Sequence, residues 1–248
     1  MKKYKIESNK RLQLQNNCDI LTKDEKDMEG TLMEKKIGIL FDLDGTLLDT
    51  LEDLTDATNY TLRYFGCPER SIQDMRRILG NGALYQLTTS RPEGATEPDP
   101  GEMLKVYLPY YEANSKNKTK PYDGIPQALA EIAKKYPVAI VSNKPDSAVK
   151  LLCADYFPGY YALGQNDECP RKPAPNMVFK AMKDIGVESC IFFGDSEVDV
   201  ITANNAGVPC IAVLWGFRDR DMLEENGAKY FCDDTSKLLS CIEEIANG

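Results

Sequence analysis

The chain contains no histidine among its 248 residues. Serine–histidine–aspartate and cysteine–histidine triads are therefore excluded, and so are histidine phosphorylation and zinc sites with histidine ligands. Any acid–base chemistry must come from carboxylates, lysine, tyrosine or cysteine. A metal ion held by carboxylates and carbonyl oxygens would be a hard cation, and Mg²⁺ is the leading candidate.

The chain also lacks an excess of positive charge and lacks long apolar runs. Lysine and arginine number 30 against 39 aspartates and glutamates, which gives a net charge of -9. Without a basic block we expect no nucleic-acid partner. No apolar run approaches the length of a membrane span, and the basic start of the chain has no apolar region typical of a secretory signal, so we expect no membrane partner.

Cysteine pairs at metal-binding or redox spacing are absent too. The eight cysteines are scattered, with no Cys-x-x-Cys pair and no Cys-x5-Arg phosphatase loop. In a chain of this length with an ordinary core we expect no disulfide framework. Cys190 and Cys210 border apolar runs and are expected to pack as small hydrophobes. The cysteines favour a reducing, cytoplasmic location.

Two segments, residues 1–36 and residues 51–118, lack the alternation of strand and helix patterns found in the rest of the sequence. Residues 1–36 are polar, without a hydrophobic period, and we expect a disordered tail. Residues 51–118 show helical patterns and loops but no convincing strand, which predicts an all-helical cap inserted into the core. Thr50 and Asp53 have the spacing of a capping box at the start of this insert. Its junctions, about 46–51 and 115–121, would serve as hinges of a lid.

In the remaining sequence, apolar runs alternate with helical hydrophobic patterns. This alternation predicts an α/β fold, a Rossmann-like three-layer core whose central parallel sheet is covered by helices on both faces. Residues 37–50 and 119–248 are expected to form this core. The strand candidates are 37–41, 138–141, 160–163, 191–193, 211–214 and 229–231.

Polar residues that could take part in catalysis or metal binding follow several of these strands. Asp42 and Asp44 come directly after 37–41, where two close carboxylates oppose each other's ionisation unless a cation lies between them. The other signals follow later strands or precede a helix: Ser142-Asn143-Lys144, Lys172, and the Gly194–Asp199 segment with Asp195 and Asp199. Because the carboxyl ends of parallel strands meet at one edge of the sheet, these groups are expected to converge there.

These motifs, in this order, resemble the haloacid dehalogenase-like (HAD) hydrolase superfamily, and most closely its phosphoglycolate phosphatase-like group with a helical cap. The resemblance covers about 36–246. It implies an Mg²⁺-dependent phosphomonoesterase that acts on a small phosphorylated metabolite through an aspartyl-phosphate, with phosphoglycolate as the best single guess. We expect a monomer or a homodimer.

The chemistry of phosphomonoester hydrolysis leads to the same roles as the resemblance. Asp42 would be the nucleophile, and Asp44 would protonate the leaving oxygen and then deprotonate water. Asp42, the backbone carbonyl of Asp44 and Asp195 would hold Mg²⁺. The remaining roles are assigned as follows: Lys172 supplies a fixed positive charge, Ser142, Asn143 and Gly82 help bind phosphate or substrate, and Asp199 orients Lys172 or a metal-bound water.

Several alternatives stay open at this point. A sugar-phosphate phosphatase, a pyrophosphatase or a β-phosphoglucomutase-like isomerase would keep the same motifs, and a non-enzymatic binding protein is a remote option. A dehalogenase would not need Asp44, because a halide leaves without a proton. Gly80-Asn81-Gly82 is either a turn between insert helices or a backbone contact to substrate. Glu197 is expected at the surface, and Tyr107, Tyr110 and Tyr111 are expected to pack within the insert.

Overall fold

The structure is a computed structural model that describes residues 36–247. The predicted tail, residues 1–36, lies outside the described residues except for Lys36. None of the helices between residues 36 and 247 combines the length and the apolar character that crossing a bilayer requires. The seven cysteines in this part of the chain are free thiols, and Cys190 and Cys210 are buried in the core as predicted.

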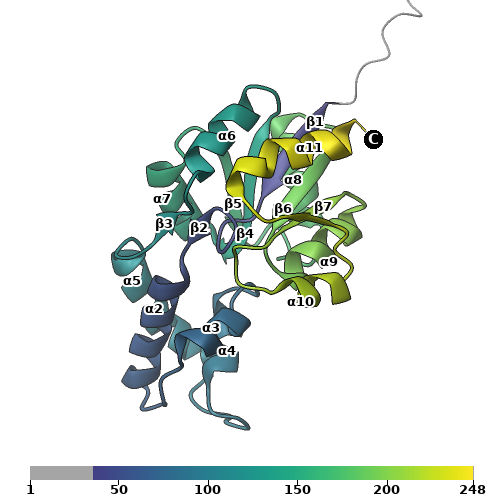
Figure 1. Cartoon of the computed structure of the whole chain (residues 1–248). Coiled ribbons are helices and arrows are strands. Elements are labelled where there is room, and N and C mark those ends of the chain that lie inside the picture. Colours follow the sequence, from purple (N-terminus) through teal and green to yellow (C-terminus); the bar gives the residue numbers. More distant parts are fainter. Residues whose placement is uncertain (1–35, 248) are drawn as a thin grey trace, which may run out of the picture. The chain divides into compact units, whose positions relative to one another are not determined.

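A six-stranded sheet, parallel throughout, forms the centre of the molecule (Figure 1). Its strands, in spatial order, are β5 (Tyr161–Gln165), β4 (Val138–Pro145), β1 (Ile37–Phe41), β6 (Ser189–Gly194), β7 (Cys210–Val213) and β8 (Tyr230–Cys232). The first strand in sequence is thus near the middle of the sheet. Each predicted strand is present, although β4 continues through Ser142 and Asn143, with a register shift between Val141 and Pro145.

Helices cover both faces of the sheet, which gives three layers (Figure 1). One hydrophobic cluster joins the sheet to three helices on one face, and a second cluster does so on the other face. The first face carries α6 (Ile125–Ala133), α7 (Asp146–Tyr156) and α11 (Leu238–Ala246), and the second carries α8 (Asn176–Ile185), α9 (Glu197–Ala206) and α10 (Arg220–Glu225). The predicted α/β fold class is confirmed.

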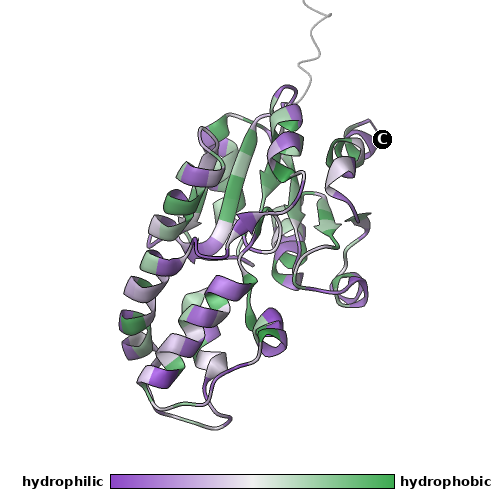
Figure 2. Ribbon diagram, turned by 60° about the vertical axis from the view of Figure 1, so that its left-hand side comes forward, coloured by the Kyte–Doolittle hydropathy of each residue, from purple (hydrophilic) through white to green (hydrophobic). Residues whose placement is uncertain are grey.

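Side-chain alternation along β1 explains why the strand needs cover on both sides. Ile39 and Phe41 belong to one cluster, and Leu40 between them belongs to the other; all three are fully buried. Successive side chains of a strand point to opposite faces, so a continuous apolar run is stable only between two helical layers. Figure 2 shows strands that are mainly green and helices that carry both green and purple residues.

Residues 51–118 form four helices and no strand (Figure 1). They are α2 (Leu51–Tyr64), α3 (Ile72–Ile78), α4 (Ala83–Ser90) and α5 (Pro100–Asn114). We call this segment the helical insert. It has a hydrophobic cluster of its own, which extends onto Ala148 of α7 and onto Phe217. A short 3-10 helix, η1 (Thr235–Lys237), lies outside the insert, just before α11.

The two ends of the insert lie side by side, an arrangement that the sequence did not indicate. Two short strands, β2 (Leu48–Asp49) and β3 (Lys120–Pro121), pair antiparallel there. The predicted capping box of Thr50 and Asp53 is wrong, because the Thr50 side chain makes no capping hydrogen bond. The buried Asp53 carboxylate instead accepts hydrogen bonds from the backbone N–H groups of Lys118 (3.0 Å) and Thr119 (2.8 Å). Asp53 therefore ties the outgoing chain to the returning chain.

We predict that Asp53→Ala lowers the free energy of unfolding by about 2–4 kcal/mol, because it leaves two backbone N–H groups without their charged acceptor. Chemical denaturation followed by circular dichroism measures this loss. Asp56→Ala is the matched control: Asp56 lies on the same helix and pairs with Lys118 at the surface. The control should cost less than about 1 kcal/mol. Equal losses in the two variants would contradict the assigned role of Asp53.

Candidate active site

Three buried carboxylates meet at the carboxyl edge of the sheet. Asp42 follows β1, while Asp195 and Asp199 lie just after β6 and at the start of α9. Each of the three offers an oxygen within 4.8 Å of the oxygens of the others. The exposed fractions are 7% for Asp42 and 1% for each of the other two. Residues more than 150 positions apart in the sequence are thus brought together, as the strand-edge argument predicted.

Lys172 is the cation at the centre of this cluster. Its side chain is 1% exposed, and its ammonium group lies 2.6 Å from Asp42 and 2.7 Å from Asp199. Burial lowers the pKa of Lys172, but its attraction to Asp199 and Asp42 outweighs burial and raises the pKa above its usual value. Lys172 therefore carries a fixed positive charge. The second oxygen of Asp199 accepts hydrogen bonds from the backbone and hydroxyl of Ser196, so Asp199 holds Lys172 in place.

One lysine does not balance three carboxylates. Burial raises the pKa of Asp42 well above its usual range, and the nearby Asp199 and Asp195 raise it further against the attraction of Lys172. Burial, with the charge of Asp199, also raises the pKa of Asp195 to about 7. Both shifts show that the cluster has more negative charge than its surroundings stabilise. An additional cation at this place would relieve the imbalance.

Glycines shape the space around Asp195. Gly45 has a φ of +84°, and a Cβ atom added there would collide with the Asp195 carboxylate. A Cβ atom on Gly216 would collide with the same side chain. Asp195 accepts hydrogen bonds from the hydroxyl of Thr46 (3.2 Å) and the backbone N–H of Phe217 (2.7 Å). Two loops thus enclose this carboxylate and fix its direction.

These donors fit a hard divalent cation. Carboxylate oxygens are the ligands that Mg²⁺ prefers, and the surplus negative charge favours such an ion. Asp42 and Asp195, both predicted ligands, belong to the cluster, and Asp199 joins them. The side chain of Asp44 lies outside this cluster; for that residue the backbone carbonyl was the predicted ligand, and this assignment stays a prediction.

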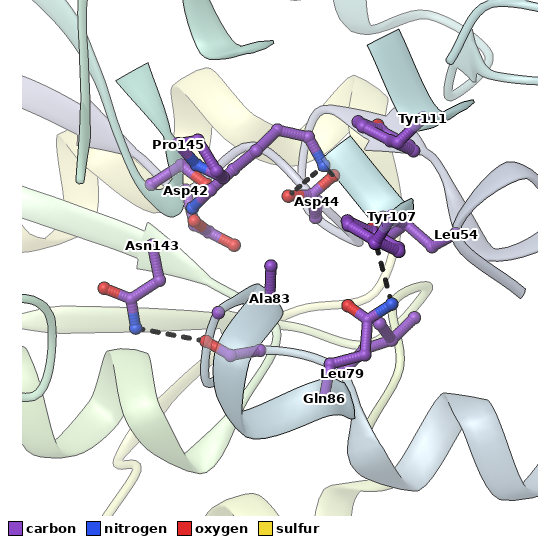
Figure 3. Close-up of a pocket in the computed structure, with 14 residues that line it drawn as sticks. Asp42, Asp44, Leu54, Leu79, Ala83, Gln86, Tyr107, Tyr111, Asn143 and Pro145 are labelled. Atoms are coloured by element: carbon purple, nitrogen blue, oxygen red, sulfur yellow. Dashed lines mark hydrogen bonds and ion pairs between the residues drawn. The ribbon is translucent and has the colours of Figure 1, made fainter. Parts of the chain in front are cut away.

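A small pocket opens beside the cluster, between the sheet edge and the helical insert (Figure 3). Its volume is about 40 Å³. Asp42, Asp44 and the Ser142–Pro145 segment line the core side, and the insert contributes the remaining wall. That wall consists of Leu54, Leu79, Gly80, Gly82, Ala83, Gln86, Tyr107 and Tyr111.

In this pocket Asp44 forms an ion pair that the sequence did not reveal. The Lys144 ammonium donates hydrogen bonds to both Asp44 oxygens, at 2.7 and 3.0 Å, and packs over the Tyr111 ring at 4.8 Å (Figure 3). Burial raises the pKa of Tyr107, and burial together with the charge of Asp44 raises that of Tyr111, so both tyrosines stay neutral. These two tyrosines pack in the insert as predicted, but they also line the pocket.

The Asn143 side chain links three loops instead of pointing freely into the pocket. Its amide exchanges two hydrogen bonds with the backbone of Lys172, at 2.7 and 2.9 Å. The same amide group donates to the carbonyl of Gly80 in the insert at 3.1 Å (Figure 3). Gly82 lines the pocket with a φ of +83°, and a Cβ atom there would lie 3.1 Å from the Asn143 carbonyl oxygen. Glycine therefore allows the insert backbone to approach the core closely.

A pair of arginines makes a second contact between insert and core. Arg218 pairs with Glu197 at 2.6 Å and donates to the carbonyls of Arg76 (2.6 Å) and Leu79 (2.8 Å) in the insert. In return, Arg76 donates to the carbonyls of residues 216–217 at 2.8 and 3.0 Å. Glu197 was expected at the surface, and its side chain, which is 25% exposed, is partly buried in this ion pair.

Sequence reasoning thus placed Lys144 in a motif without giving it a role, and it missed Arg218 and Arg76. A signal existed for two of them. Lys144 directly follows the predicted Ser142-Asn143 pair, and Arg218 follows β7, whose carboxyl end reaches the same edge of the sheet. Nothing in the sequence pattern indicated Arg76, because its partners are backbone carbonyls of a distant loop.

The structure combines an α/β fold with a buried carboxylate cluster at the carboxyl edge of its sheet. The family model of haloacid dehalogenase-like hydrolases matches residues 39–213, so the chain belongs to that family. The match includes all the carboxylates described above. This confirms the predicted family.

Curated relatives and solved structures agree with this assignment. Phosphoglycolate phosphatase 1 of Pseudomonas aeruginosa is 31% identical over 219 residues, which cover 84% of this chain and 80% of that protein. Phosphoglycolate phosphatase of Mesorhizobium japonicum is 32% identical, over 75% of this chain and 86% of its own. A Lactobacillus delbrueckii crystal structure, provisionally named a phosphoglycolate phosphatase, is 34% identical with a TM-score of 0.78, over 84% and 98% of the two chains. Together they confirm the prediction of an enzyme of the phosphatase class.

We predict that Gly45→Ala prevents Mg²⁺ from stabilising the protein, because the new methyl group would displace Asp195. The measurement is the shift in melting temperature on adding Mg²⁺. Gly66→Ala is the matched control: Gly66 also has a positive φ, of +70°, but has no neighbour within 4 Å of an added Cβ. Both variants carry backbone strain of about 1–3 kcal/mol. A normal Mg²⁺ shift in Gly45→Ala would refute the close approach described above.

The pKa of Asp195 also predicts how stability depends on pH. The pKa is about 7 in the folded protein, against about 4 in an unfolded chain. Between these values the folded state binds more protons, so the metal-free protein should lose stability as pH rises from about 4 to 7. Asp42 acts in the same direction. The stabilisation by Mg²⁺ should therefore be larger at about pH 8 than at about pH 5.5. Thermal unfolding with EDTA or Mg²⁺ tests this, and an equal Mg²⁺ effect at both pH values would contradict it.

Proposed function

We propose that this protein is an Mg²⁺-dependent phosphomonoesterase that acts on a small phosphorylated metabolite through an aspartyl-phosphate on Asp42. The observation that carries the proposal is the cluster of Asp42, Asp195 and Asp199 around Lys172, next to a pocket that also holds Asp44. Family membership and the phosphatase relatives support the same reaction class.

Asp42 is the proposed nucleophile. It is the first carboxylate after the central strand, it lines the pocket, and Lys172 fixes one of its oxygens at 2.6 Å. The other oxygen attacks phosphorus, and the bond from phosphorus to the leaving oxygen breaks. Asp42 and Asp195, with the backbone carbonyl of Asp44, would hold Mg²⁺, which when bound neutralises the carboxylates and allows a phosphate dianion to approach.

Asp44 is the proposed general acid and base. It lies on the pocket side of the cluster, facing the helical insert, so it can reach the oxygen that leaves (Figure 3). Asp44 donates a proton to this oxygen, and the alcohol departs. Asp44 then takes a proton from the attacking water, which breaks the bond between Asp42 and phosphorus and releases phosphate. The two steps consume one water molecule, and the proton that Asp44 takes from water replaces the one that it gave to the leaving oxygen.

Three further residues complete the proposed phosphate site. Ser142 is buried at the pocket wall, and its hydroxyl accepts a hydrogen bond from the backbone of Lys144, which leaves its own proton free for a phosphoryl oxygen. Lys172 contributes positive charge. Asn143 supports both residues by holding the Lys172 loop, so it acts through position more than through direct contact.

The helical insert, residues 51–118, is proposed to act as the cap over this site, with Gly82 placing its backbone near the substrate. The pocket of about 40 Å³ favours a leaving group of only a few atoms; pockets for drug-sized ligands measure roughly 300–1,000 Å³. Phosphoglycolate, the substrate in the names of the curated relatives, is that small. It is our best candidate, ahead of sugar phosphates, nucleotides and isomerase substrates.

The test is phosphate release from a panel of phosphoesters with Mg²⁺ or EDTA. The panel includes phosphoglycolate, sugar phosphates, nucleoside monophosphates and pyrophosphate. We expect Mg²⁺-dependent turnover, highest with phosphoglycolate, and none with EDTA. Absence of phosphate release from every compound would refute the proposed activity.

Two substitutions test the roles of the aspartates. Asp42→Asn should reduce turnover by roughly 10³-fold or more, because the nucleophile is lost. Asp44→Asn should slow hydrolysis of the phosphoenzyme, so that intact-protein mass spectrometry detects a trapped phosphoryl group. Asp155→Asn, which removes only an exposed partner of Lys116, is the matched control and should keep normal turnover. Full activity in Asp42→Asn would overturn the assignment.

A further inference from the structure

Lys144 is the positively charged side chain of the pocket that a substrate could contact. Among the described lining residues it is the only one with a positive charge. Its side chain is 5% exposed, and the 14% exposed side chain of Asp44 is its only ion-pair partner in this part of the chain. An ammonium group has three N–H donors. Among the described residues those of Lys144 reach only Asp44, and the nitrogen lies 4.8 Å from the centre of the Tyr111 ring.

The other cations near the site are already engaged by the protein. Lys172 lies between two carboxylates, Asp42 and Asp199. Arg218 is held by Glu197 and by backbone carbonyls of the insert. Arg171 donates a hydrogen bond to the backbone carbonyl of Asn81 in the insert. Among these cations, only Lys144 both lines the pocket and pairs with a residue that exchanges a proton in the proposed reaction. That residue is Asp44.

The position of Lys144 coincides with the leaving-group side of the site. Asp44 must contact the leaving oxygen in order to protonate it, and the Lys144 nitrogen lies only 2.7 Å from an Asp44 oxygen. Any group attached one carbon beyond the leaving oxygen would therefore come next to Lys144. In a phosphorylated hydroxy acid such as phosphoglycolate, that group is a carboxylate.

We propose that Lys144 determines substrate specificity by binding a carboxylate on the leaving group, so that the preferred substrates are phosphate esters of short hydroxy acids. This inference rests on the proposed phosphatase function and deepens it. In the free enzyme both Asp44 oxygens accept hydrogen bonds from Lys144. A substrate carboxylate gives the ammonium group a new partner and leaves an Asp44 oxygen available to the leaving oxygen.

Burial makes this exchange selective. A leaving group without negative charge must also approach Asp44, but it offers the buried ammonium no replacement partner, and an unpaired buried charge is unfavourable. The surrounding wall does not compensate, because Leu54, Leu79 and Ala83 are apolar. Gln86 is engaged with Thr58 at 2.6 Å and with Tyr107 at 3.4 Å. The pocket thus selects for charge as well as size.

The experiment compares kcat/KM for phosphoglycolate with kcat/KM for ethyl phosphate, which has the same heavy-atom chain without a carboxylate. The protein is the full chain with saturating Mg²⁺. The wild type should prefer phosphoglycolate strongly. In Lys144→Gln the ratio of the two values should fall by about 10- to 100-fold, the size of one lost hydrogen bond to a charged group. A role limited to supporting Asp44 would lower both values together and leave the ratio unchanged.

Controls keep the result interpretable. Lys144→Arg preserves the charge and should retain more of the ratio than Lys144→Gln does. Lys150→Gln removes a lysine that is 66% exposed on α7, and it should leave the ratio as in the wild type. Melting temperatures identify a variant that fails to fold. For the wild type alone, inhibition by glycolate but not by ethanol is a second, independent sign of carboxylate binding.

The outcomes separate this inference from the proposed function. If the wild type hydrolyses phosphoesters but does not prefer phosphoglycolate, or if the ratio in folded Lys144→Gln changes by less than about tenfold, the role of Lys144 is refuted and the phosphatase function stands. If the wild type releases phosphate from neither compound and from no other member of the panel, the proposed function itself fails.

Discussion

The site depends on how three buried carboxylates are kept together. Carboxylate oxygens of Asp42, Asp195 and Asp199 lie within 4.8 Å of one another, and Lys172 pairs with Asp42 and Asp199. The raised pKa values of Asp42 and Asp195 show that this arrangement is electrostatically incomplete. Stability alone would favour fewer charges at this place, since unpaired buried carboxylates destabilise a fold. The cost is consistent with a site built to bind a divalent cation and a phosphate group.

The surrounding fold holds this cluster rigidly. The central parallel sheet places the carboxylates at one edge. Glycines at positions 45 and 216 allow the backbone of two loops to approach Asp195 closely. The loop that includes Gly216 and Phe217 also contacts the helical insert through Arg76 and Arg218. The insert therefore touches the same loop that orients Asp195, and its position is physically connected to the site.

The pair of Lys144 and Asp44 concerns the choice of substrate, whereas the carboxylate cluster concerns the phosphate group. The pair lies between the carboxylate cluster and the insert, where a leaving group would be placed. In the proposed function the carboxylate cluster would interact only with the phosphate group, so it would not distinguish one phosphomonoester from another. Discrimination between substrates would then come from the groups that surround the leaving group, where the Lys144 charge and the small pocket would favour a short, anionic leaving group.

The sequence by itself determined the fold class and the order of the core strands along the chain, because hydrophobic periodicity is a local property. It also placed Asp42, Asp195, Asp199, Lys172 and Ser142 near the carboxyl edge of the sheet, because the strand-edge rule is general. It did not reveal α7, α10, β2 and β3, or that Asp53 binds the returning chain instead of capping a helix. Only the tertiary structure decided that Lys144 pairs with Asp44 and that Arg218 pairs with Glu197 and the insert. The partners in the first pair are 100 residues apart, and Arg218 reaches carbonyls 139 and 142 residues away. Such pairs follow from how loops pack in space, which no local pattern encodes.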